Sequence, residues 1–136
     1  MSEKSDEKRV KLLLVDDEKP FVEVLKKRLI KRNIDVTTAF SGTEGIQVVR
    51  KVDFDIAVLD LKMGDMDGLE VLKTFKRMYS AMEVIILTGH GTEETVQDGI
   101  NLGAVAYLSK PCDFEELIAT INNAISNKEK YSSQFE

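Results

Sequence analysis

Short apolar runs alternate along the chain with longer segments whose apolar residues recur at helical spacing. We predict five buried strands, at residues 10–16, 35–39, 56–60, 84–88 and 105–108. Most of these runs are almost entirely apolar, which is typical of parallel strands that helices cover on both faces. The run at 35–39 is more polar, so we expect it to lie nearer to an edge of the sheet.

The segments between the strands are predicted as helices, because their apolar residues repeat with a period of about 3.6 residues. Residues that favour helix starts stand at the head of each segment, namely Pro20, Ser41, Asp67, Thr92 and Asp113. The buried faces are expected to hold Phe21, Val24, Leu25 and Leu29, then Ile46 and Val49, then Leu69, Leu72 and Phe75, then Val96 and Ile100, and finally Phe114, Leu117, Ile118, Ile121 and Ile125. Right-handed connections between such elements give an α/β fold, a doubly wound three-layer sandwich.

The 136 residues suit one domain, with a body at 10–127, a polar N-terminal segment at 1–9 and a polar tail or start of a linker at 128–136. A net charge of −5 argues against direct nucleic-acid binding by this chain. Cys112 is the one cysteine, so no internal disulfide can form. The start lacks the apolar core of a signal peptide, and no apolar run is long enough to span a bilayer. We therefore expect a soluble cytoplasmic protein without membrane contact.

Polar and charged residues stand where the predicted strands end. Asp16 and Asp17 follow the first strand, Asp60 closes the third, Thr88 ends the fourth and Lys110 comes shortly after the fifth. The carboxyl ends of parallel strands meet at one edge of an open sheet, where α/β folds place their binding sites. We therefore expect three carboxylates, a hydroxyl and an ammonium group to gather at that edge.

These residue types point to phosphoryl chemistry. Free aspartates are ionised at neutral pH, so three carboxylates at one site repel one another, and a divalent cation removes that penalty. Mg²⁺ prefers hard oxygen ligands and keeps several waters, so two carboxylates and a carbonyl are enough protein ligands. A carboxylate can itself be the nucleophile toward a phosphoryl group, with a lysine and a hydroxyl holding the phosphoryl oxygens. The pattern indicates a magnesium-assisted phosphoryl-accepting site.

The chain resembles the receiver domains of bacterial two-component response regulators. The resemblance covers about residues 10–127 and rests on Asp16-Asp17, Asp60, Met66-Asp67-Gly68, Thr88-Gly89, Tyr107 and Lys110-Pro111, in this order. One such motif is weak evidence, whereas the full ordered set is strong evidence. The resemblance implies a flavodoxin-like fold, in which five parallel strands lie in the order 2-1-3-4-5.

The resemblance also implies roles for the acids and the lysine. Asp60 would accept the phosphoryl group from the phosphohistidine of a sensor histidine kinase or phosphotransfer protein. Asp17, Asp60 and the backbone carbonyl of Lys62 would bind Mg²⁺, with Mn²⁺ as a substitute. Asp16 would act on the metal through a bound water, and Lys110 would pair with the phosphoryl group. The domain would catalyse only its own phosphotransfer and slow autodephosphorylation, so it is not expected to be an enzyme.

The remaining residues of the resemblance concern the switch. Thr88 would shift to hydrogen-bond the phosphoryl group while Tyr107 turns inward, although a plain core aromatic explains Tyr107 equally well. Lys62 and His90 would influence how long the phosphate lasts, and the peptide bond before Pro111 would be cis. Added charge would shift a population of conformations. An output domain, a partner or a second copy would read the fourth helix, fifth strand and fifth helix, roughly residues 92–127.

Three other functions fit parts of the sequence. An aspartate-nucleophile phosphohydrolase typically carries Asp-x-Asp after the first strand, whereas here the sequence is Asp16-Asp17-Glu18. A flavin or nucleotide binder of the same topology needs a phosphate-cradling loop there, and these acids repel phosphate unless a metal is bound. A receiver that binds proteins without being phosphorylated has no need for the full set of acids, hydroxyl and lysine.

Overall fold

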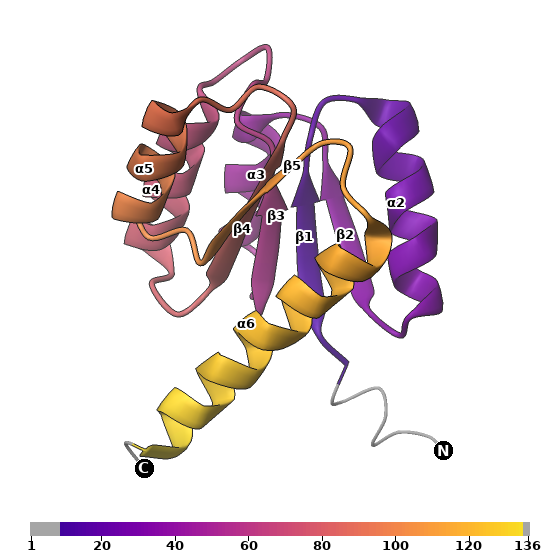
Figure 1. Ribbon diagram of the computed structural model, residues 1–136, viewed down its shortest axis with the longest axis vertical. Helices are drawn as coiled ribbons and strands as arrows, with labels where there is room; N and C mark the ends of the chain where they lie inside the picture. The colour runs from indigo at the N-terminus through magenta and orange to yellow at the C-terminus, as the bar shows by residue number, and fades with distance from the viewer. Residues whose placement is uncertain (1–8, 135–136) are drawn as a thin grey trace.

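The computed structural model describes the backbone of residues 9–134 and the side chains of residues 9–128 (Figure 1). Within this range the strands are β1 (Lys11–Val15), β2 (Asp35–Ala39), β3 (Ile56–Leu59), β4 (Glu83–Thr88) and β5 (Ala106–Ser109), and the helices are α2 (Lys19–Lys31), α3 (Gly42–Val49), α4 (Gly68–Met78), α5 (Glu93–Asn101) and α6 (Phe114–Gln134). The predicted alternation of strands and helices is confirmed.

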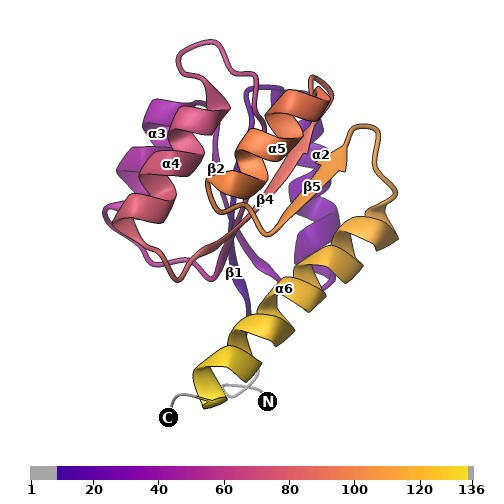
Figure 2. The ribbon, with the colours of Figure 1, turned by 60° about the vertical axis from the view of Figure 1, so that its left-hand side comes forward.

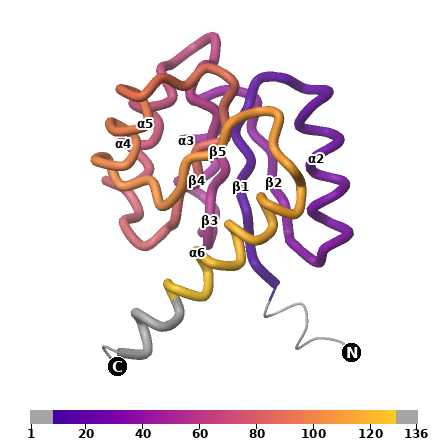
Figure 3. The backbone as a smooth tube through the Cα atoms, in the orientation of Figure 1, coloured from indigo at the N-terminus to yellow at the C-terminus, as the bar shows by residue number. Residues whose placement is uncertain are grey.

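The strands form one parallel sheet in the order β2-β1-β3-β4-β5. This order confirms the expected flavodoxin-like topology and places the more polar strand, β2, at an edge. Helices α2 and α6 lie on one side of the sheet, and α3, α4 and α5 lie on the other (Figures 1 and 3). The loops that follow β1, β3, β4 and β5 come together at one edge, the top of Figure 1.

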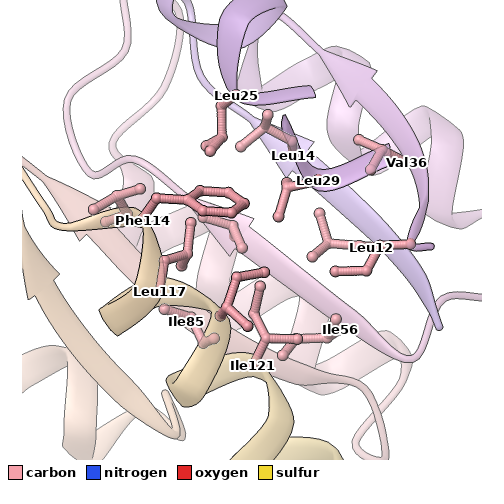
Figure 4. Close-up of a cluster of buried hydrophobic side chains, with 14 of the residues drawn as sticks. Leu12, Leu14, Leu25, Leu29, Val36, Ile56, Ile85, Phe114, Leu117 and Ile121 are labelled. Atoms are coloured by element: carbon pink, nitrogen blue, oxygen red, sulfur yellow. The ribbon is translucent and has the colours of Figure 1, made fainter. Parts of the chain in front are cut away.

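Each face of the sheet has its own apolar core, because alternate residues of a strand point to opposite faces. Leu12 and Leu14 of β1 belong to the cluster that α2 and α6 cover, whereas Leu13 and Val15 belong to the cluster beneath α3 and α4. Figure 4 shows the first cluster, where side chains of α6 such as Phe114 meet those of α2 and the central strands. Burial on both faces explains why the strand sequences are almost uniformly apolar.

Three helix starts are capped as the sequence predicts. The side chain of Ser41 accepts a hydrogen bond from the Glu44 N–H, and that of Asp67 accepts one from the Leu69 N–H. Thr92 and Thr95, in the first turn of α5, form a capping box, in which each side chain accepts a hydrogen bond from the backbone N–H of the other residue. These caps fix where α3, α4 and α5 begin, and so where the preceding loops end.

Two expected core positions are on the surface instead. Val24 is 60% exposed, and the buried face of α2 is formed by Val22 with two leucines that follow it at helical spacing. Ile100 is 44% exposed, because α5 approaches the sheet through Gly99, where an added Cβ would meet the side chain of Ile86. Both differences have one cause: the buried face of each helix is centred on other residues, so Val24 and Ile100 lie outside it.

The C-terminal helix is longer than the sequence pattern predicts. Helix α6 continues to Gln134, so the backbone of residues 128–134 is helical. No glycine or proline interrupts this stretch, so nothing in it ends the helix after the apolar pattern stops. Figure 2 shows α6 running diagonally across its face of the sheet.

The expected N-terminal segment lies, except for its last residue, outside the described residues, as do residues 135–136. No helix of the described part is both long and apolar enough to cross a membrane.

Candidate phosphoryl-accepting site

The register of β1 and β3 brings two of the predicted acids together. Val15 of β1 is paired with Leu59 of β3, and these are the last residues of both strands. The next residues, Asp16 and Asp60, therefore leave the sheet side by side, with the Asp60 N–H donating to the Val15 carbonyl at 3.0 Å. Their carboxylates are almost fully buried, at 2% and 3% exposure.

The register of β4 and β5 places the hydroxyl and the ammonium group at the same edge. Thr88 of β4 is paired with Ser109 of β5, and the N–H of Lys110 donates to the Thr88 carbonyl at 2.9 Å. The Thr88 hydroxyl is buried and accepts a hydrogen bond from the His90 N–H at 3.2 Å. The peptide bond between Lys110 and Pro111 is cis.

Asp16, Asp17 and Asp60 form a cluster in which one carboxylate oxygen of each lies within 4.8 Å of the others. Burial raises the pKa of the Asp16 carboxyl, and its hydrogen bond from Lys110 offsets part of that rise. Asp17 is exposed, so the cluster opens to solvent on one side. Three hard oxygen donors with a solvent-facing side fit Mg²⁺, which takes carboxylate ligands and retains waters. The cluster could therefore hold such an ion.

The β3–α4 loop folds back on itself beside Asp60. Lys62 and Asp67 form an isolated antiparallel bridge, and the Gly68 N–H donates to the Leu61 carbonyl at 2.8 Å. A Cβ on Gly68 would collide with the backbone of Leu61 and with the Asp60 carbonyl oxygen, so only glycine allows this close approach. The closed loop holds Lys62, the expected carbonyl ligand, two residues after the phosphoacceptor candidate Asp60.

The same loop is tied down at its tip. The Gly64 N–H donates to Asp17 at 3.3 Å, which links the loop to the acid cluster. The Asp65 carboxylate accepts from the N–H groups of Gly42 and Thr43 at 3.0 and 2.9 Å and from the Thr43 hydroxyl at 2.7 Å. The bonds from Thr43 hold the pKa of Asp65 below its usual value. Asp65 thus joins the loop to the start of α3, a role that the sequence did not indicate.

Lys110 is the central cation of the site. Its Nζ lies 2.7 Å from Asp16, 2.6 Å from Glu18 and 3.6 Å from Asp60, and 4.3 Å from the centre of the Phe21 ring. Burial by itself lowers the pKa of Lys110, but the hydrogen bonds to Asp16 and Glu18, together with the negative charges of Asp16 and Asp60, outweigh burial, so the net shift is upward. Lys110 is therefore a charged ammonium group at neutral pH, and its shortest contacts are not with Asp60.

Glu18 is the site residue that the sequence interpretation missed. It stands at the N-cap position of α2, yet its side chain makes no capping hydrogen bond. Its carboxylate pairs instead with Lys110, whose hydrogen bond lowers the pKa of Glu18. The available signal was a third acid directly after Asp16-Asp17. The sequence could not show that this third side chain turns toward a lysine at the end of another strand.

Tyr107 lies beside the β4–α5 loop. Its hydroxyl is 3.5 Å from the Thr95 Oγ1, and either oxygen can be the donor. A Cβ on Gly91 would collide with the Tyr107 ring and hydroxyl, so the loop passes directly against this side chain. The half-buried ring also contacts the core beneath α3 and α4. Tyr107 therefore connects strand β5 to the segment that leads from Thr88 into α5.

Lys62 and His90, the two residues expected to influence phosphate lifetime, are both exposed. They line one hollow of about 260 Å³ together with Asp67, Thr95 and nearby apolar side chains. This hollow lies between the β3–α4 and β4–α5 loops, which carry Asp60 and Thr88 at their starts.

The fold and the residues of this site are typical of receiver domains, and comparison with known families gives the same classification. Residues 12–122 match the model of the response regulator receiver domain. This chain belongs to that family, which confirms the expectation drawn from the motifs at the strand ends.

Two similar proteins are transcriptional regulators of Escherichia coli (strain K12). The transcriptional regulatory protein ZraR is 34% identical over 118 residues, which are 87% of this chain and 27% of that protein. The transcriptional regulatory protein GlrR is 35% identical over 114 residues, which are 84% of this chain and 26% of that protein. The chain thus spans about a quarter of the length of these relatives.

Solved structures agree on the fold. The CheY-like response regulator receiver domain protein from Methanospirillum hungatei JF-1 has a TM-score of 0.88 at 28% identity, covering 90% of this chain and 98% of its own. The response regulator receiver domain protein from Clostridium thermocellum has a TM-score of 0.85 at 35% identity, with the same coverage of 90% and 98%.

Proposed function

We propose that this domain, at residues 10–127, is a phosphoacceptor switch, in which Asp60 receives a phosphoryl group from the phosphohistidine of a sensor histidine kinase or phosphotransfer protein. One observation carries the proposal: the buried Asp60 carboxylate lies at a strand end, clustered with Asp16 and Asp17 and 3.6 Å from the Lys110 ammonium group. Three acids and one cation at a solvent-open edge suit a reaction that needs a nucleophile and charge neutralisation.

In the transfer step a carboxylate oxygen of Asp60 attacks phosphorus, forming an oxygen–phosphorus bond as the nitrogen–phosphorus bond of the donor breaks. The electron pair stays on the imidazole of the donor, which leaves neutral when its other nitrogen carries a proton. Lys110 balances charge on the phosphoryl oxygens. The Thr88 hydroxyl already accepts a bond from His90 N–H, so its own proton remains for a phosphoryl oxygen.

Asp17, Asp60 and the backbone carbonyl of Lys62 would hold Mg²⁺, or Mn²⁺ in its place, and Asp16 would act through a bound water. When bound, the cation would neutralise negative charge on the carboxylates and the phosphoryl oxygens. The protein's own contribution is to hold these oxygens together, which the β1–β3 register and the closed β3–α4 loop do.

The output of the switch is proposed to be the surface of α5, β5 and α6, in residues 92–127. Thr88 lies at the start of the segment that leads to α5, and Tyr107 of β5 packs against that segment at Gly91. A shift of Thr88 toward the phosphoryl group would therefore be felt by Tyr107. An output domain, a partner protein or a second copy would read the change, without direct nucleic-acid contact by this acidic domain, in the cytoplasm.

The phosphorylated state would decay by slow hydrolysis at the same site. Lys62 and His90 border the hollow between the two loops, so their side chains would influence the approach of water to the phosphoryl group. The domain would thus act on its own phosphoryl group and would not turn over a substrate.

Intact-mass measurement tests the proposal. We expect the wild-type chain to gain the mass of one phosphoryl group when it is incubated with acetyl phosphate and Mg²⁺. Asp60→Asn should gain none, and Asp53→Asn, which alters an exposed acid elsewhere, should behave as wild type. A wild-type chain that gains no mass would contradict the proposal and favour a receiver that only binds proteins. Equal gain by Asp60→Asn would move the phosphoacceptor to another residue.

A further inference from the structure

We propose that Glu18 is a built-in competitor for the Lys110 ammonium group and limits how readily the site accepts a phosphoryl group. This inference rests on the proposed function and deepens it. The Glu18 carboxylate is 2.6 Å from Lys110 Nζ, whereas the nearest Asp60 oxygen is 3.6 Å away, beyond hydrogen-bond distance. The Lys110 ammonium group, which is proposed to balance charge at Asp60, is thus bound more closely by Glu18.

The place of Glu18 in the fold supports this role. At an N-cap, a short polar side chain commonly accepts a hydrogen bond from the first turn of its helix, and Glu18 makes no such bond with α2. Its carboxylate still lies at a helix start, where the helix dipole favours negative charge. The side chain therefore contributes an ion pair with Lys110 in place of a cap.

The ion pair between Glu18 and Lys110 changes the charge balance of the site. A bound Mg²⁺ ion and the Lys110 ammonium group would together balance the three carboxylates of the aspartate cluster. Glu18 adds a negative charge that nothing among these groups balances, beside the place where a phosphoryl group would bring more. The ammonium group has three donors; Asp16 and Glu18 each receive one of them. Phosphoryl oxygens on Asp60 must use the remaining donor or displace Glu18.

Displacement of Glu18 is the easier change. Its side chain is 59% exposed, whereas that of Asp16 is 2% exposed. An ion pair with one exposed partner is weak, because water solvates the released carboxylate. Glu18 therefore tunes the site and does not block it, and removing its charge should favour the phosphorylated form.

Binding of beryllofluoride, a phosphoryl analogue that needs no group transfer, tests the inference. In the presence of Mg²⁺ we expect Glu18→Gln to bind it about two- to fivefold more tightly than wild type, the range expected for losing a weak, exposed ion pair. Isothermal titration calorimetry gives the affinities, and the rate of mass gain from acetyl phosphate should rise in parallel. Glu23→Gln, which removes the same charge from an exposed position of α2, should bind as wild type.

The outcomes separate the two proposals. If wild type binds beryllofluoride and Glu18→Gln binds it equally or less tightly, Glu18 is not a competitor, although the switch function stands. If Glu23→Gln tightens binding as much, the effect is general charge and the inference fails. If wild type binds no beryllofluoride, the proposed function itself fails. Glu18→Ala is the second variant, and it should tighten binding as the glutamine variant does, with thermal melting to verify that both are folded.

Discussion

At the residue scale, Lys110 connects most of the site. It touches acids from the β1–α2 loop and lies near Asp60, the acid that follows β3. Because its folded pKa is raised, the stabilisation from these contacts is fully present below the unfolded value of 10.5 and is lost as pH rises through the higher folded pKa. Across the neutral range Lys110 is therefore charged, as a partner for phosphoryl oxygens must be.

Asp17 gives a prediction at this scale. Asp17→Asn should weaken Mg²⁺ binding by about tenfold or more, since even residues that only support metal ligands change affinity by about ten- to a hundredfold. Calorimetric titration with Mg²⁺ measures the effect, and Asp53→Asn serves as the matched control because it removes an exposed acid from the loop that precedes β3, at the end of that strand opposite to Asp60. Unchanged affinity in Asp17→Asn would remove this residue from the metal site.

The strand-end residues were predictable individually, because an acid that directly follows a buried strand must emerge at the carboxyl edge of a parallel sheet. Asp16, Asp60, Thr88 and Lys110 all do so. The ion pair between Glu18 and Lys110 was not predictable. The position of Glu18 in the sequence indicates where its backbone lies, but it does not indicate which residue its long side chain contacts. Such contacts depend on rotamers and on loops far apart in the sequence.

At the scale of elements, the β3–α4 loop connects the acid cluster to α3. One side of it contacts Asp17 through Gly64, and the other bonds the first turn of α3 through Asp65. A segment held at both sides presents the Lys62 carbonyl in a fixed place. Asp65 would therefore support the proposed metal site without touching it, by satisfying N–H groups that a helix start leaves unpaired.

Asp65→Ala should lower the free energy of unfolding by about 1 kcal/mol, the usual cost of losing the acceptor at a helix N-terminus. The folded pKa of Asp65 is below 3.8, so its stabilisation is present above 3.8 and is lost as pH falls through the folded value. Urea unfolding at neutral pH and in acid measures this, with Asp53→Ala as control. A difference from wild type that is equally large in strong acid would show that the carboxylate charge is not responsible.

The boundaries of strands and helices were predictable wherever a clear sequence signal marks them. Apolar runs set the strands, and caps at Ser41, Asp67 and Thr92 set the helix starts. The end of α6 did not follow, because polar residues can continue a helix when no breaker is present. The buried face of α2 was also misplaced, since Val24 is apolar but lies opposite Val22 on the helix.

At the scale of the whole molecule, the edge strand β5 differs from the central strands. Its residues are half-buried or exposed, whereas β3 is fully buried. Ile100 and Val105 expose apolar side chains on either side of the turn into β5, at 44% and 40%. This part of the sheet is therefore the least constrained by packing, which suits its proposed role as the surface that would change on phosphorylation.

Beryllofluoride with Mg²⁺ should shift the backbone amide NMR signals of residues 92–127 as well as those of the loops around Asp60. The helix α3, which lies near the opposite edge strand β2, should change much less. Asp60→Asn serves as the control and should show no shift. Changes confined to the loops next to the site would contradict a switch that reaches α5, β5 and α6.

The α/β class follows from the alternation of periods, because short apolar strands joined by amphipathic helices leave few other arrangements. The strand order does not follow from it. Nothing in the composition of β1 says that it lies between β2 and β3; that order came from the resemblance to receiver domains. The two separate cores likewise appear only when the sheet is assembled.

Trapping the phosphorylated residue tests the central claim most directly. Borohydride reduces an aspartyl phosphate to homoserine, and peptide mass spectrometry then gives the position of the change. After incubation with acetyl phosphate and Mg²⁺, we predict homoserine at position 60 and nowhere else in the chain. Homoserine at position 16 or 17, or none at all in a chain that has gained phosphoryl mass, would contradict the assignment of Asp60 as the phosphoacceptor.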